Sequence, residues 1–172
     1  MRVSLIKRLV SVGDTTIREA LYKLLKPMKE RYRTCVHATA GLVIKAGGSA
    51  LAKTGAAVCH LTVKGKNRRI AASTDMPALV GTVVNATHNV FVFTIDDAGT
   101  TYVQMGTAGS AEANVRWPDL NPERAIIGYI KVNPTGTGNF VGGTTALDDA
   151  TVVPNAAYVS PVGMFDPTAA ID

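Results

Sequence analysis

The sequence predicts a mainly β protein: an antiparallel β-sandwich or barrel, jelly-roll-like in type, preceded by a short α-helical arm. Two observations predict the β part. After Thr34 the chain consists largely of short runs of β-branched and aromatic residues, and Gly, Asn and Asp occupy the gaps between the runs. A third observation predicts the arm: before residue 34, apolar residues recur at the spacing of one helix face.

The positive charge of the chain is concentrated in this first segment. Residues 1–33 contain nine Lys or Arg against three acids, whereas the remainder contains nine basic and ten acidic residues. A length of 172 residues is enough for one domain and an extension. We therefore divide the chain into a basic arm, residues 1–34, and a β-sandwich body, residues 35–172.

An amphipathic helix is predicted in the arm. Thr16 and Glu19 have the spacing of a capping box, and Pro27 should end or kink the helix because it lacks a backbone N–H. The apolar stripe comprises Ile17, Leu21, Leu24, Leu25 and Met28. Basic residues beside the stripe are Arg18, Lys23 and Lys26.

A helix this short is marginal in water, so its stripe needs a surface to dock on. The candidate docking surfaces are the body of the same chain, another protein (including a sister subunit) and a membrane surface. The helix has no interfacial Trp or Phe, which argues against a membrane, and the arm has no recognisable base-reading or stacking module, which argues against a specific nucleic acid. We expect a protein partner.

Seven strands are predicted in the body. The residues between 89 and 95 are nearly all apolar or β-branched, which suits a central strand covered on both faces, and Asp96–Gly99 is predicted to turn into the next strand. Gly128 marks a bulge or a close backbone approach. A long Gly- and Thr-rich loop follows residue 132, with a short strand at 139–141. The predicted strands are 36–44, 58–63, 80–84, 90–95, 101–105, 125–132 and 152–159.

A basic cluster falls in a predicted hairpin around Gly65. Its members are Lys64, Lys66, Arg68 and Arg69. An exposed turn explains the cluster, and so does a second contact to an acidic partner. Both interpretations stay open at the level of sequence.

The body has few charged residues, and only 18% of the whole chain is charged. Two interpretations follow: the body buries surface against copies of itself, or it is a plain β-domain coated in Thr and Ser. The first predicts a homo-oligomer.

No catalytic, metal or cofactor site is predicted. The three histidines show no metal-ligand spacing, and the Gly-rich stretches lack the order of a phosphate loop. Cys35 and Cys59 lie in apolar runs, so we expect free buried thiols. No segment has the length of a membrane span, and Lys7 and Arg8 interrupt the N-terminal apolar run, so we expect synthesis in a cytoplasm. The chain is not expected to be an enzyme.

The body resembles small virion structural proteins of tailed bacteriophages. The resemblance covers most of residues 38–168 and excludes the arm. It is carried by stretches of sequence and not by a catalytic motif: Gly41–Lys53, Asn89–Phe93, Met105–Gly109, Ala125–Ile130 and Asn139–Asp148.

This resemblance implies a capsid decoration (cement) protein or a head-fibre component, commonly a trimer. The implied partner is the major capsid protein, and the implied location is the capsid surface of the virion. The alternative is an adhesive module of a head or tail fibre that contacts the host surface.

Overall fold

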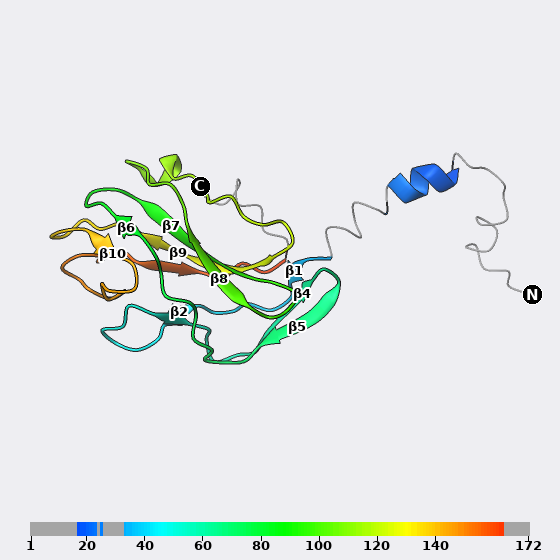
Figure 1. Ribbon diagram of the computed structural model, residues 1–172, viewed down its shortest axis with the longest axis horizontal. Coiled ribbons are helices and arrows are strands. Elements are labelled where there is room, and N and C mark those ends of the chain that lie inside the picture. Colours follow the sequence, from blue (N-terminus) through cyan, green and yellow to red (C-terminus); the bar gives the residue numbers. More distant parts are fainter. Residues whose placement is uncertain (1–16, 24, 26–32, 164–172) are drawn as a thin grey trace, which may run out of the picture.

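The computed structural model describes residues 17–23, 25 and 33–163, and it is mainly β (Figure 1). Every strand pairing in it is antiparallel, and the architecture is sandwich-like, as the sequence predicts. The elements in chain order are β1 (Cys35–Val36), β2 (Val43–Ile44), β3 (Ala52–Lys53), β4 (Cys59–Val63), β5 (Lys66–Ile70), β6 (Thr82–Val83), β7 (Asn89–Ile95), β8 (Thr101–Met105), the 3-10 helix η1 (Glu112–Asn114), β9 (Ala125–Val132), β10 (Phe140–Val141) and β11 (Ala157–Val159).

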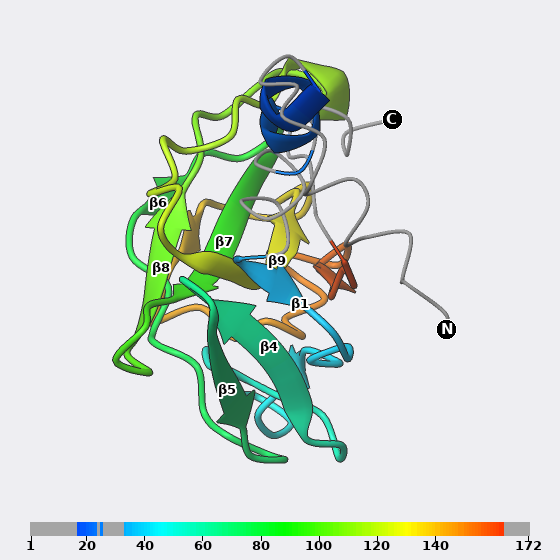
Figure 2. The same ribbon diagram turned by 90° about the vertical axis from the view of Figure 1, so that its right-hand side faces the viewer.

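Two sheets form the layers of the sandwich. The larger has the order β11-β9-β7-β8, and the smaller has the order β1-β4-β5 (Figure 2). Their facing side chains belong to one apolar core, which includes Leu61 and Val63 of β4 and Phe91 and Phe93 of β7. The pairs β6–β10 and β2–β3 form two further small ribbons.

β7 is the central strand of the larger sheet, and both of its faces are covered. All seven of its residues are buried. Phe91 and Phe93 face the main core, whereas Val90 and Val92 face a second apolar cluster that includes Tyr129. The prediction of a doubly covered central strand is confirmed, and the continuous apolar run follows from this double burial.

Gly128 lies both beside a β-bulge and at a close backbone approach, the two alternatives that the sequence predicted for this position. The register between β7 and β9 shifts at Phe93, so that Ile127 becomes the extra residue of a bulge beside Gly128. A Cβ atom on Gly128 would lie 2.5 Å from the carbonyl oxygen of Val159. The bulge lets β9 place apolar residues in the main core on both sides of the irregularity, at Ala125 and at Ile130.

Two hairpins have turns that the local sequence explains. β4 and β5 are joined by Lys64 and Gly65, both with positive φ (51° and 77°), which is the backbone of a type I′ turn. At the β7–β8 turn, the Asp96 carboxylate accepts hydrogen bonds from the backbone N–H groups of Ala98 and Thr100, each 2.9 Å long. The predicted hairpins at both places are confirmed.

Three of the predicted strands are too long. The segment 36–44 contains the end of β1 and the whole of β2, separated by a loop, and the segments 80–84 and 152–159 contain only β6 and β11. β-branched residues in these segments are used for packing and not for continuous pairing: Val153, for example, is buried in the core but lies outside any strand, between two turns. Propensity alone does not supply a pairing partner.

Candidate functional site

The candidate functional site of the arm is its helix, which covers residues 17–23 and 25 and which we call the arm helix. Ile17, Leu21 and Leu25 of the predicted stripe have exposed fractions of 42%, 41% and 56%. Arg18 and Lys23 are exposed on the same helix. Figure 1 shows the helix away from the strands of the body. The described part of the stripe is therefore not buried by the sandwich.

Other members of the predicted stripe lie outside the described residues. These are Leu24 and Met28, together with Lys26 on the basic side. The predicted capping residue Thr16 and the predicted stop at Pro27 also lie outside them. The assignment of these residues to partner binding stays a prediction from helical spacing.

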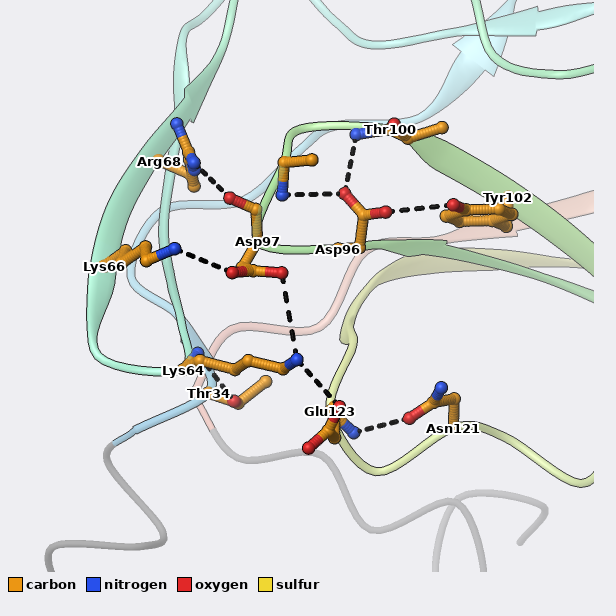
Figure 3. Close-up of polar contacts among 11 residues, drawn as sticks. Thr34, Lys64, Lys66, Arg68, Asp96, Asp97, Thr100, Tyr102, Asn121 and Glu123 are labelled. Atoms are coloured by element: carbon orange, nitrogen blue, oxygen red, sulfur yellow. Dashed lines mark hydrogen bonds and ion pairs between the residues drawn. The ribbon is translucent and has the colours of Figure 1, made fainter.

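The basic cluster of the sequence lies on the β4–β5 hairpin, and we call it the hairpin cluster (Lys64, Lys66, Arg68 and Arg69). Three members contact the acidic turn of the other sheet (Figure 3). Lys66 Nζ lies 2.8 Å from Asp97 Oδ2, and Arg68 donates to the backbone carbonyl of Asp97. Lys64 Nζ lies 2.7 Å from Glu123 Oε2 and 3.8 Å from Asp97 Oδ1.

These contacts change the acidity of the groups involved. The hydrogen bond to Lys66, followed by the nearby positive charges of Lys66 and Lys64, lowers the pKa of Asp97. The hydrogen bond to Glu123 raises the pKa of Lys64, against a smaller opposing effect of desolvation. In each case the contact with an opposite charge stabilises the charged form of the group, and the pKa shifts as a result.

The hairpin cluster thus has an internal role that its sequence did not reveal. Lys64, Lys66 and Arg68 tie the edge of the smaller sheet to the β7–β8 turn and to the segment before β9. Arg69 is exposed and lies opposite His60 in the β4–β5 pairing. The hypothesis that the cluster also binds a partner stays a prediction, and Lys66 and Arg69 are its exposed members.

A second candidate surface lies on the β6–β10 ribbon, and sequence reasoning did not predict it. Val80, Val84 and Val141 have exposed fractions of 72%, 56% and 40%, and we call them the valine patch. Val141 pairs with Thr82, which lies between the other two and is also exposed. Alternation explains the patch, because Val83 points into the core while its neighbours point outward. The sequence pattern alone does not predict which of these valines are buried and which are exposed.

The described residues contain neither a metal-binding group of side chains nor a helix that could span a membrane. Among them, no group of three or more His, Cys, Asp or Glu side chains could hold a metal ion. No helix within the described ranges is long and apolar enough to cross a bilayer. Cys35 and Cys59 are both free and buried, as predicted, and burial raises the pKa of the Cys59 thiol.

No protein-family model, no curated protein and no solved structure matches this chain.

Proposed function

We propose that this protein decorates the outside of a tailed-phage capsid and stabilises it, with the arm as the segment that grips the major capsid protein. One observation carries the proposal: the arm helix presents an exposed apolar stripe, at Ile17, Leu21 and Leu25, beside basic side chains. The resemblance of the body to virion structural proteins supports the same assignment. On this proposal the protein acts at the virion surface and not as an enzyme.

In this proposal the basic residues and the apolar stripe of the arm helix make different contributions to binding. Basic residues alone give a long-range, salt-sensitive attraction to any acidic surface. An apolar stripe needs a complementary groove, and helix-in-groove binding uses apolar residues that recur along one face of a helix, as Ile17, Leu21 and Leu25 do. Their combination favours an acidic protein surface with an apolar groove.

Self-association completes the proposal, with a homotrimer as the expected assembly. The valine patch is the feature of the body that favours it, because three exposed valines lie on one ribbon with Thr82 between them. Interface cores are depleted of charge in the same way. Three arms on one trimer would bind a symmetric shell together, which raises the avidity well above that of one arm.

The test is binding to capsids that lack this protein. Capsids are incubated with the purified chain and sedimented, and the bound fraction is measured. Leu21→Asp should abolish most of the binding, since a carboxylate in an apolar groove is costly to desolvate. Glu19→Gln, on the opposite side of the helix, is the matched control and should bind at least as well as the native chain.

Salt separates the two contributions to binding. Raising the ionic strength should weaken binding of the native chain by screening the arm, while the residual binding still depends on Leu21. If Leu21→Asp and the native chain occupy capsids equally at every salt concentration, the arm helix is not the gripping segment.

A further inference from the structure

A pocket of about 120 Å³ lies on the outer face of the larger sheet, between β9 and the segment that carries η1. Its apolar lining comes from the second cluster of the fold and includes Val90 and Val115. Trp117 and Tyr129 also line it, with their rings packed edge to face at a centroid distance of 4.9 Å. An apolar, aromatic-lined hollow with a few polar groups has the general character of a small-ligand site.

A buried polar atom in this lining points to a ligand. Asn133 lines the pocket, and its side-chain oxygen is buried without a hydrogen-bond partner among the residues that the structure describes. Buried acceptors are nearly always satisfied, since leaving one unpaired costs free energy. A hydroxyl or amide donor bound beside Asn133 would supply the missing hydrogen bond.

The charges of the pocket argue for an uncharged ligand. Its two oppositely charged side chains, Lys131 and Glu112, form an ion pair with each other. Their charges therefore cancel locally, and neither an anionic nor a cationic ligand is selected. The remaining polar side chains of the lining include the imidazole of His88 and neutral amides such as Asn155, whose Nδ2 donates to Thr135 Oγ1 over 3.3 Å.

The size of the pocket limits the ligand to about one six-membered ring. A closed protein cavity of about 150 Å³ holds a benzene molecule, and this pocket is comparable and open on one side. A pyranose ring combines two surfaces that suit the lining. Its C–H face carries slight positive charge and packs on the electron-rich face of an aromatic ring, while its hydroxyl groups donate and accept hydrogen bonds.

We propose that this pocket binds a neutral hexopyranose, either as a free sugar or as the terminal residue of a glycan. Trp117, which is partly exposed and packs against the buried ring of Tyr129, supplies the packing surface, and Asn133 accepts a hydrogen bond from a sugar hydroxyl. The site belongs to the body and is built without the arm, so it goes beyond the proposed grip on a capsid and does not depend on it.

Trp117 is the only tryptophan of the chain, so its fluorescence reports on this pocket alone. The full-length chain is titrated with glucose, galactose, mannose and N-acetylglucosamine, and in a second arm with polysaccharides that end in the sugars that bind. We expect a saturable change in emission with at least one sugar, at a dissociation constant of about 1 mM, typical of a weak small-ligand site near −4 kcal/mol. Benzene and glucuronic acid are titrated as the apolar and the anionic comparison.

Two variants locate the binding. Asn133→Ala should weaken the affinity about three- to tenfold, as expected for one lost hydrogen bond. Ala157→Phe, at an exposed position on the pocket lining, should fill the hollow and remove the signal. The control is Thr94→Val, because Thr94 has a buried hydroxyl without a hydrogen-bond partner among the described residues and does not line the pocket.

Circular dichroism establishes that each variant is folded before it is titrated. The proposal is overturned if no sugar changes the emission of the native chain up to the limit of solubility. Binding of benzene or glucuronic acid in preference to every neutral sugar also overturns it, as does sugar binding that Ala157→Phe leaves intact.

Discussion

Gly128 shows how one residue allows two elements to meet. The position has no unusual φ, so its requirement is for space and not for conformational freedom. A Cβ atom there would approach Leu42 Cδ1 to 2.6 Å as well as the Val159 carbonyl oxygen to 2.5 Å. One of these neighbours is backbone of the segment that pairs with β9, which cannot shift without breaking the edge of the sheet.

Gly128→Ala should therefore destabilise the protein by about 1–3 kcal/mol, the range for overpacking a well-packed site. Urea unfolding followed by circular dichroism measures the change. Gly47→Ala is the matched control, since its nearest neighbour is Asp148 Oδ2 at an ordinary 3.9 Å, and it should change the free energy of unfolding by less than about 0.5 kcal/mol. Equal stabilities of the two variants would contradict the close approach.

Asp97 makes the stability of the folded body depend on pH. Its pKa is lowered in the folded state, chiefly by the hydrogen bond to Lys66, so its contribution is present above the ordinary carboxyl pKa of 3.8 and is lost as the pH falls through the lower folded value. Asp97→Asn should be less stable than the native chain at pH 7, and its stability should fall less steeply below about pH 4. Thermal unfolding across this range is the measurement, and parallel pH profiles would count against the role of Asp97.

At the scale of elements, the sequence predicted best the strands that pair over their full length. The segments 101–105 and 125–132 coincide with β8 and β9, and the central strand matches β7, because continuous burial leaves a continuous apolar run. The short strands were overextended. β6 and β10 are two residues each, and their extent is set by a partner more than fifty residues away along the chain, which local propensity does not contain.

Among the candidate sites, those within one segment could be predicted from the sequence, and those that join distant segments could not. The stripe of the arm helix follows from spacing within one segment, and Ile17, Leu21 and Leu25 are exposed where the helix is described. The pocket and the valine patch join residues that are distant in sequence, such as Trp117 with Asn133 and Val80 with Val141. The internal contacts of the hairpin cluster were missed for the same reason, since Asp97 belongs to the other sheet.

The arm should be dispensable for folding of the body. The described side chains of the stripe are exposed, so their loss removes little buried apolar area. A chain lacking residues 1–32 keeps Arg33, whose carbonyl oxygen accepts a 2.7 Å hydrogen bond from Gly65 N–H. Its free energy of unfolding should lie within about 1 kcal/mol of the full chain in urea titrations. A larger loss would place the arm among the elements that stabilise the sandwich.

At the scale of the whole molecule, the arm carries the excess positive charge together with its exposed apolar stripe, and the body carries the valine patch. If the patch mediates self-association, Val80→Lys should shift the chain to monomers in sedimentation equilibrium by burying a charge in the interface. Val162→Lys is the control, because Val162 is similarly exposed but precedes Gly163, which pairs with Val36 of β1 and not with the β6–β10 ribbon. Identical sedimentation of the native chain and both variants would exclude the patch as the interface.

The most direct test of the decoration role is electron cryo-microscopy of capsids saturated with the native chain. The account predicts that the β-body lies on the outer surface and that the arm helix is seated on the major capsid protein, with the side of Ile17, Leu21 and Leu25 against the shell. Capsids that carry no added density on their outer surface, or a body held there while this stripe faces solvent, would contradict it.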